Sequence, residues 1–199
     1  KLEAALAMAR RLYKGDHPSI ASNLNGLGAC LKLMGRLEDA LPQYEAALSM
    51  SRRICKGDHR DVVRGLNNVA ACLAELGRME EAMPQLEASV VICRRIYKGD
   101  HPEIASGLNN LATCLEVSGR SAEALPKFEE ALAMHSRLYQ GDHPDVAKDR
   151  SNLGAGLYTL GRYPEALPQS EASLAMSKRL YKGNHRALAT GLNNLALCL

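Results

Sequence analysis

The sequence contains no tryptophan and a single phenylalanine, and aromatic residues make up 4% of its 199 positions. Proteins that bind single-stranded nucleic acid use aromatic side chains as stacking platforms, so this scarcity argues against such a function. The net charge of +3 is too small to indicate binding to nucleic acid or to an anionic membrane. No apolar run approaches the roughly 20 residues of a membrane-spanning helix. We therefore expect no nucleic-acid partner and no membrane partner.

The short motifs of common enzyme classes are also absent. The sequence has no G-x-x-x-x-G-K-[ST], no G-x-S-x-G and no H-E-x-x-H. Lys-Gly-Asp recurs at 14–16, 56–58 and 98–100, but one glycine does not make a loop that cradles phosphates. These absences predict a protein that is not an enzyme and has no cofactor.

The dominant feature that is present is an internal repeat of 42 residues. Three types of residue recur at this interval: His17, His59, His101, His143 and His185; Gly35, Gly77, Gly119 and Gly161; Pro42, Pro84, Pro126 and Pro168. A fixed period between 20 and 50 residues is typical of solenoids, which bury their core between neighbouring copies. The repeat therefore predicts one continuous array rather than several globular domains.

The six cysteines follow the repeat. Four of them share one position (Cys30, Cys72, Cys114 and Cys198), where the remaining copy has Gly156. Equivalent helices of adjacent copies should lie farther apart than the Cα separation of about 7 Å that a disulfide tolerates. Cys55 and Cys93 stand alone. We expect free thiols that act as small packing residues, as in a reducing, cytoplasmic environment.

Each copy contains the pattern of two helices joined by a tight turn. In the first full copy, the first helix is expected near 18–34 and the second near 37–56, with Gly35-Arg36 as the turn. Gly-Asp-His-Pro precedes the first helix, and Asp100 and Glu103 have the spacing of a capping box. The same pair is expected at 60–98, 102–140 and 144–182, between a lone second helix at 1–13 and a lone first helix at 186–199. The prediction is ten helices and no strand.

The apolar residues of the third copy carry a family resemblance. They form the pattern Leu108-x-x-Leu111-Ala112-x-x-Leu115, followed by Ala124-x-x-x-Phe128 and Ala131. This pattern resembles the tetratricopeptide repeat. The segments GDHPDVAK (141–148) and LNNLA (108–112 and 192–196) resemble the long repeats of kinesin light chains and related bacterial proteins. The departures are the period of 42 instead of about 34, the missing tryptophan, and Arg150 where other copies have leucine.

The resemblance implies an all-α, right-handed α-solenoid of antiparallel helix pairs that spans the whole chain, 1–199. Its parts would be a second helix of a partial repeat (1–14), full repeats at 15–56, 57–98, 99–140 and 141–182, and a first helix of a partial repeat (183–199). Because those two ends are complementary, we expect head-to-tail self-association, in which Leu192, Leu195, Ala196 and Leu199 of one copy cover Leu2, Ala5 and Leu6 of the next.

Two recurrent charged features are expected to be structural. One histidine per copy, at a helix junction, does not supply the three or four ligands that a zinc ion needs, so no metal site is predicted. His135 is the only histidine outside this register, and we expect it to pack rather than to catalyse. Basic pairs at the ends of the second helices, such as Arg52-Arg53, complement the helix dipole.

Asparagines recur at two adjacent positions of the repeat: Asn25, Asn67, Asn109 and Asn193 at the first, and Asn68, Asn110, Asn152 and Asn194 at the second. This asparagine ladder is the strongest candidate site. In tetratricopeptide arrays the first helices line a concave groove, and in the related family asparagines at matching positions contact bound peptides. The resemblance implies a peptide-binding groove formed by Arg64, Asn67, Asn68, Asn109, Asn110, Thr113, Lys148, Asn152 and Tyr158. An amide can hold a peptide backbone whatever its sequence, and Arg64 and Lys148 would attract acidic residues or a terminal carboxylate. Alternatively, the asparagines satisfy neighbouring backbone groups and have a purely structural role.

The function predicted is therefore a protein-interaction scaffold that binds a peptide or protein segment. An alternative is a regulatory or sensor array of a larger signalling protein, whose effector enzyme lies outside these residues.

Overall fold

A computed structural model describes residues 2–198, with side chains from Ala4 to Cys198. These residues form ten α-helices and no strand: α1 (Leu2–Leu12), α2 (Pro18–Leu33), α3 (Leu37–Ile54), α4 (Arg60–Glu75), α5 (Met79–Ile96), α6 (Pro102–Val117), α7 (Ser121–Leu138), α8 (Pro144–Thr159), α9 (Tyr163–Leu180) and α10 (Arg186–Cys198). The expected helix number is confirmed. Even-numbered helices are the first helices of the copies, and odd-numbered helices are the second helices.

The recurrent histidines begin the first helices. Each is an N-cap residue whose Nδ1 atom accepts the backbone N–H two residues later, as for His17 and Ser19 at 3.2 Å. The same bond recurs at His59, His101, His143 and His185. The capping box expected from Asp100 and Glu103 is wrong, because His101 is the cap and Asp100 accepts two hydrogen bonds from Arg137. The Gly-Asp-His segment therefore caps the first helix through its histidine side chain.

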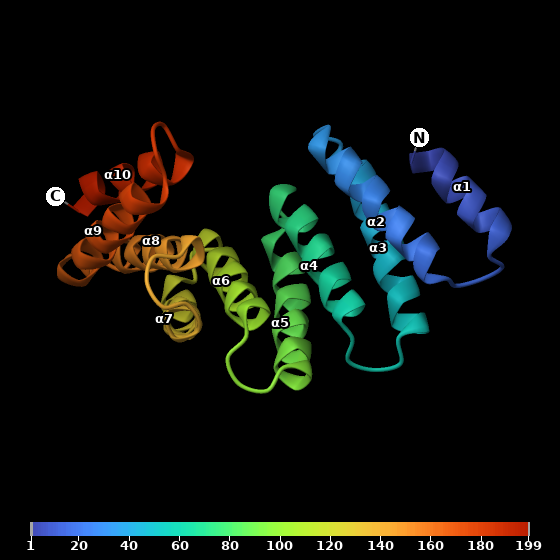
Figure 1. The fold of residues 1–199 in the computed structure, drawn as a ribbon, viewed down its shortest axis with the longest axis horizontal. Helices are drawn as coiled ribbons and strands as arrows, with labels where there is room; N and C mark the ends of the chain where they lie inside the picture. Colours follow the sequence, from blue (N-terminus) through green and yellow to red (C-terminus); the bar gives the residue numbers. More distant parts are fainter. Residues whose placement is uncertain (1, 199) are drawn as a thin grey trace. The chain divides into compact units, whose positions relative to one another are not determined.

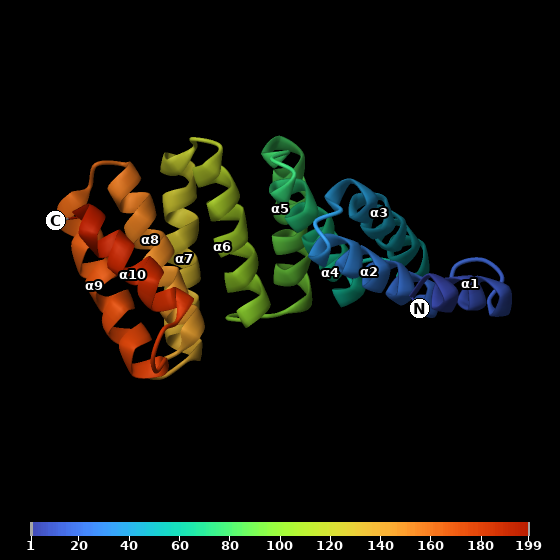
Figure 2. The same cartoon turned by 90° about the horizontal axis from the view of Figure 1, so that it is seen from above.

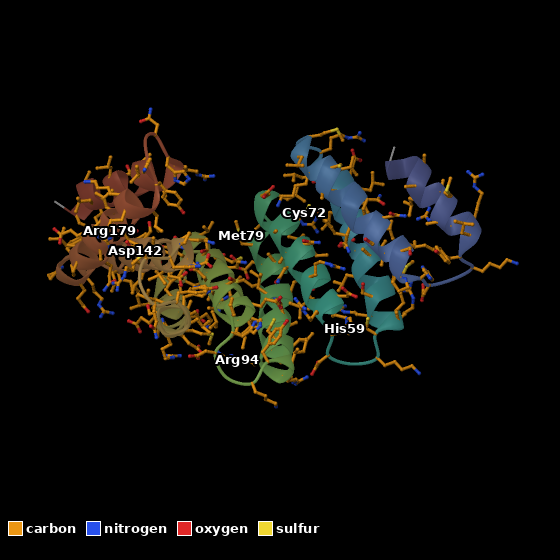
Figure 3. The ribbon with its side chains drawn as sticks, viewed as in Figure 1. His59, Cys72, Met79, Arg94, Asp142 and Arg179 are labelled. Carbon is orange, nitrogen blue, oxygen red and sulfur yellow. The ribbon has the colours of Figure 1, made fainter. Side chains whose placement is uncertain are left out.

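The aspartate of each Gly-Asp-His motif ties the start of a first helix to the end of a second helix. Asp142 accepts from Nε and Nη2 of Arg179 at 2.6 and 2.7 Å, and both residues are labelled in Figure 3. The equivalent pairs, 37 residues apart, are Asp16–Arg53, Asp58–Arg95 and Asp100–Arg137. The basic pairs therefore do more than complement the helix dipole, because the second residue of each pair also forms a salt bridge with one of these aspartates.

The turn inside each copy depends on a glycine in the left-handed region. At Gly119 φ is +76°, and Arg120 N–H bonds back to Leu115 carbonyl at 2.9 Å, the pattern of a Schellman motif. The equivalent glycines at 35, 77 and 161 have φ between +72° and +77°. A Cβ there would meet no atom within 4 Å, so backbone conformation, rather than close helix packing, requires glycine.

The helices divide into two compact units, Lys1–Tyr97 with α1–α5 and Lys98–Leu199 with α6–α10. In the first unit, α2 packs on α3 and α4 on α5, while α1 packs on α2 and α3 on α4 (Figure 1). In the second unit, α6 packs on α7 and α8 on α9, while α7 contacts α8 and α10 contacts both α8 and α9 (Figure 2). Each unit thus contains two sequential antiparallel helix pairs and one further helix, α1 in the first unit and α10 in the second.

Fully buried alanines at one repeat position allow the two helices of a pair to approach closely: Ala40, Ala82, Ala124 and Ala166, each with 0% exposure. Phe128 is likewise fully buried and lies against Gly156, where a Cβ would be 3.4 Å from its ring. All six cysteines are free, as expected. At the ends, Leu192 is 54% exposed and Leu6 is buried, while the side chain of Leu2 and all of Leu199 lie outside the described residues.

Candidate functional site

The asparagine ladder connects consecutive first helices within each unit. In the first unit, Nδ2 of Asn68 on α4 donates to Oδ1 of Asn25 on α2 at 3.2 Å. In the second unit, Nδ2 of Asn152 on α8 donates to Oδ1 of Asn109 on α6 at 3.0 Å. Each amide bridge uses one of the two N–H groups of its donor, so the donor keeps a second N–H and its own oxygen. The ladder therefore has a structural role and still leaves polar groups for a ligand.

The predicted groove residues differ in how accessible they are. Asn109 is 2% exposed, and its oxygen is used by Asn152, so it supports another ladder residue. The others are half-buried (Asn67, Asn68, Asn152 and Tyr158) or exposed (Arg64, Asn110, Thr113 and Lys148). Arg64 also pairs with Asp61 at 2.8 Å, and the Thr113 hydroxyl donates to the Asn109 carbonyl.

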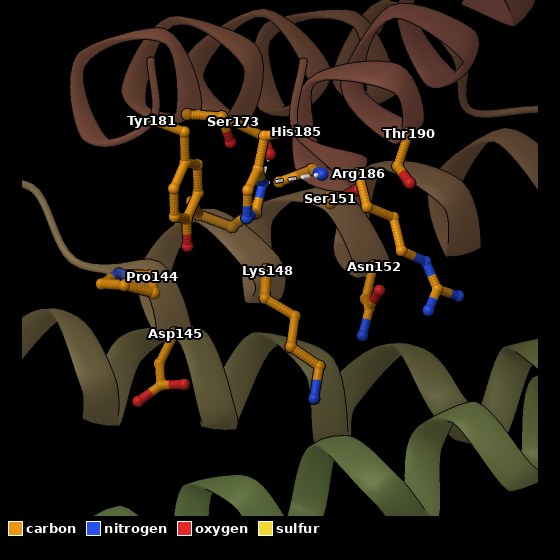
Figure 4. A pocket seen from close by; sticks show the side chains of 13 residues that line it. Pro144, Asp145, Lys148, Ser151, Asn152, Ser173, Tyr181, His185, Arg186 and Thr190 are labelled. Atoms are coloured by element: carbon orange, nitrogen blue, oxygen red, sulfur yellow. Dashed lines mark hydrogen bonds between the residues drawn. The ribbon is translucent and has the colours of Figure 1, made fainter. Parts of the chain in front are cut away.

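A pocket with a volume of about 490 Å³ lies between α8, α9 and α10 in the second unit (Figure 4). Two predicted residues, Lys148 and Asn152, line it. Sequence reasoning missed other main contributors: Ser173, Ser177, Tyr181, His185, Arg186 and Thr190. Thr190 has the same repeat position as Lys148, so the 42-residue period could have identified it as a groove residue. In Figure 4 the side chains of Lys148, Asn152 and Arg186 extend in the same direction from α8 and α10.

One side of the pocket is lined by a small side chain, Ser177, where the preceding copy has a larger one. Ser177 and Gly191 occupy the positions that His135 and Asp149 hold one copy earlier. In that earlier copy the imidazole of His135 fills the space next to the backbone of Pro102, the counterpart of Pro144 in the pocket wall. Ser177 and Pro144 line the pocket, and among the described residues no imidazole occupies the equivalent space there.

A second, smaller hollow lies farther along α8, with a volume of about 240 Å³. It is lined by Gly154, Ala155, Tyr158, Thr159, Asn194 and Leu197. Tyr158 packs at a tilt against Tyr163, with ring centroids 5.3 Å apart. Nearby, burial raises the pKa of Glu116 on α6, while its hydrogen bond with Thr159 acts in the opposite sense. This end of α8 therefore offers aromatic and apolar surface, in contrast with the basic end at Lys148.

His135 and Asp149 form a buried pair that the sequence did not predict. Nδ1 of His135 on α7 is 2.6 Å from Oδ2 of Asp149 on α8, and each residue is 1% exposed. Burial alone would lower the pKa of His135, but the hydrogen bond and charge of Asp149 outweigh it and raise that pKa. Burial also raises the pKa of the Asp149 carboxyl, against the opposing effect of His135. His135 is thus more than a packing residue.

Comparison with known proteins gives one family. The family model described as "Tetratricopeptide repeat" matches residues 1–53, 61–135, 103–176 and 147–199. No curated relative matches the sequence. No helix within residues 2–198 is long and apolar enough to cross a membrane.

Solved structures with a similar fold include repeats of a putative kinesin light chain from Podosopora anserina, at a TM-score of 0.79 and 20% identity, covering 92% of this chain and 87% of that one. BtubC (BKLC) from P. vanneervenii has a TM-score of 0.84 and 23% identity, covering 99% and 80%. Aspartyl phosphate phosphatase F from Bacillus subtilis has a TM-score of 0.81 and 15% identity, covering 100% of this chain and 49% of that one. The TM-scores show that these proteins share the fold of this chain.

Proposed function

Because the chain belongs to the tetratricopeptide repeat family, whose members are generally non-catalytic protein-interaction scaffolds, we propose that it binds a segment of a partner protein along its first helices. The observation that carries this proposal is the pocket between α8, α9 and α10, which combines an amide with two cationic side chains. Asn152 provides a free N–H and an oxygen for a peptide backbone, while Lys148 and Arg186 provide positive charge.

The chemistry of the pocket favours a carboxylate of the bound segment. Lys148 and Arg186 lie at its rim, and Asp145 is the only acidic side chain among its lining residues. Hydrogen bonds from a cation to a carboxylate are about twice as strong as those between neutral groups. An aspartate, a glutamate or a C-terminal carboxylate would therefore bind here more strongly than a neutral side chain.

The smaller hollow next to Tyr158 would take an apolar side chain of the same segment. Lys148 and Tyr158 are ten residues apart on α8, which corresponds to about 15 Å along a helix. An extended peptide covers this distance in roughly four to five residues. The preferred segment would thus carry an acidic residue and an apolar residue at about that separation.

The test uses the intact chain and a display library of short random peptides. We expect the selected peptides to be enriched in a carboxylate that lies roughly four to five residues before or after an apolar residue. Fluorescence anisotropy would then compare Asn152→Ala, Lys148→Glu and the triple variant Asn68→Ala, Asn110→Ala, Asn152→Ala. Each lost hydrogen bond should reduce binding by on the order of 1 kcal/mol.

Lys178→Glu is the matched control, because it makes the same charge change on an exposed residue of α9 that does not line the pocket. It should leave the affinity nearly unchanged at physiological salt, where charges farther apart than about 8 Å are screened. Equal loss of binding in Lys148→Glu and Lys178→Glu would show that general charge, rather than the pocket, holds the peptide. Unchanged affinity in the triple variant would refute a role for the ladder.

A further inference from the structure

One copy of the repeat differs from the others at the junction between its second helix and the next first helix. At this position, where α3 ends, the chain has Cys55, and the equivalent residues are Tyr13, Tyr97, Tyr139 and Tyr181. In three of the tyrosine copies the phenol ring stacks on the N-cap histidine, with centroids 3.5 Å apart for Tyr13–His17 and Tyr139–His143 and 3.7 Å apart for Tyr181–His185. The fold therefore directs the side chain at this position onto the imidazole.

With cysteine in place of tyrosine, a thiol comes close to the imidazole of His59 and the carboxylate of Asp61. One ligand atom from each of the three residues lies within 4.8 Å of the other two. Nδ1 of His59 is 3.6 Å from Oδ2 of Asp61, and His59 lies on the loop between α3 and α4, where Figure 3 labels it. Cys55 and Asp61 are half-buried and His59 is exposed, so an ion can reach all three.

We propose that Cys55, His59 and Asp61 form a binding site for a zinc-type transition-metal ion at the α3–α4 junction. Sulfur, imidazole nitrogen and carboxylate oxygen are the three ligand types that zinc takes in proteins, at about 2.0–2.3 Å. The thiolate disfavours magnesium and calcium, which require oxygen ligands. Three protein ligands leave the fourth tetrahedral position for water. The Cys55 thiol releases its proton to solvent when the ion binds, and the two anionic ligands then neutralise a divalent cation.

The existing contacts of these side chains are compatible with the ion. Arg64 occupies Oδ1 of Asp61 at 2.8 Å, which leaves Oδ2 on the side of the histidine. Nδ1 of His59 accepts the backbone N–H of Asp61 at 3.1 Å, so an ion bound at that nitrogen replaces a capping hydrogen bond with a coordinate bond. Ligand distances within 4.8 Å need only small side-chain rotations to reach one ion.

The chain contains its own control. His143 and Asp145 have the same arrangement as His59 and Asp61, with Nδ1 and Oδ2 again 3.6 Å apart, but Tyr139 stands where the thiol would be. That copy lacks the sulfur ligand and should not bind the ion. The difference between the two junctions isolates the contribution of Cys55.

The test is a titration of the intact chain with Co²⁺, which substitutes for zinc and gives a charge-transfer absorption when a thiolate coordinates it. We expect one equivalent of Co²⁺ with this absorption, displaced by Zn²⁺. Cys55→Ser and Cys55→Tyr should lose the absorption, and the second variant restores the residue of the other copies, so it should remain folded by circular dichroism. Cys30→Ser and Cys198→Ser, at the other half-buried thiols, should keep it.

Tyr139→Cys provides a test by gain of binding, because it places a thiol beside the existing His143 and Asp145. A second equivalent of thiolate-bound Co²⁺ is expected in this variant. Absence of the charge-transfer absorption in the wild-type chain would overturn the proposal. So would its persistence in Cys55→Tyr, since another cysteine would then be the ligand.

Discussion

Replacement of the buried pair of His135 and Asp149 tests how one copy of the repeat is held to the next. Two other second-helix and first-helix contacts within a unit, α3 with α4 and α9 with α10, have small residues at the same positions, Ser51 with Gly65 and Ser177 with Gly191. Three variants are therefore informative: His135→Ser, Asp149→Gly and the double variant that restores the residues of these other contacts.

The magnitudes follow from burial. His135→Ser leaves a carboxylate that is 1% exposed, and its Oδ1 already has no hydrogen-bond partner among the described residues. Breaking a buried pair on one side costs about 3–5 kcal/mol. Asp149→Gly leaves an imidazole that can become neutral, so the cost should be lower, at about 1–3 kcal/mol for the unsatisfied group plus about 1 kcal/mol for glycine in a helix. The double variant leaves no unpaired buried charge, so it should cost less than the sum of the two single variants, and its remaining cost comes from the cavity and the helical glycine.

Urea unfolding followed by circular dichroism would give the three free energies, and hydrogen exchange in α7 and α8 would localise the effect. The local measurement matters because repeat proteins can unfold in parts. We expect a coupling free energy of more than about 2 kcal/mol between the two substitutions. If the two single effects simply add in the double variant, the pair makes no specific contribution and the reasoning is refuted.

The same pair predicts a pH dependence with a definite sign. The pKa of His135 is raised above its ordinary value of 6.5 in the folded chain, so the folded state binds the proton more tightly than the unfolded state. Its stabilising contribution is fully present below pH 6.5 and is lost as pH rises through the raised value. The raised pKa of Asp149 acts in the same direction. Asp145 and Lys148 on α8 are the other charged groups that influence the pair, and both belong to the wild type and to the double variant.

The stability of the wild type relative to the double variant should therefore decrease from pH 6 toward alkaline pH. A stability difference that grows with pH would contradict the direction of these pKa shifts.

Two further predictions concern the turns and caps. Gly119→Val should destabilise the chain by more than about 1 kcal/mol in a thermal or urea melt because φ is +76°, whereas Gly119→Asn, which tolerates this region, should cost less. A neutral melt for the valine variant would show that the turn can relax. His143→Ala should cost about 1 kcal/mol through loss of the N-cap, and His143→Asn should recover most of it; equal melts for both would exclude the cap.

The features that the sequence predicted correctly depend on local chemistry. A helix start needs a capping side chain within two or three residues, and the turn at Gly119 needs a residue that tolerates positive φ. Such requirements recur in every copy, so the 42-residue period located ten helices to within a few residues of their observed ends. The one local error, the capping box at Asp100, arose because two candidate caps are adjacent and only the structure shows that Asp100 bonds to Arg137.

Contacts between residues distant in sequence could be decided only by the tertiary structure. Asn109 and Asn110 are neighbours with the same side chain, yet the first is 2% exposed and the second is exposed, because a helix turns by about 100° per residue against its neighbours. His135 and Asp149, which are 14 residues apart, meet across two helices, and Ser177, the counterpart of His135, lines the pocket; the sequence pattern indicated neither contact. The sequence by itself determined the helices, their turns and their family. Packing between helices decided which polar residues are buried together and which remain accessible to a partner, because burial depends on the side chains that the fold brings alongside.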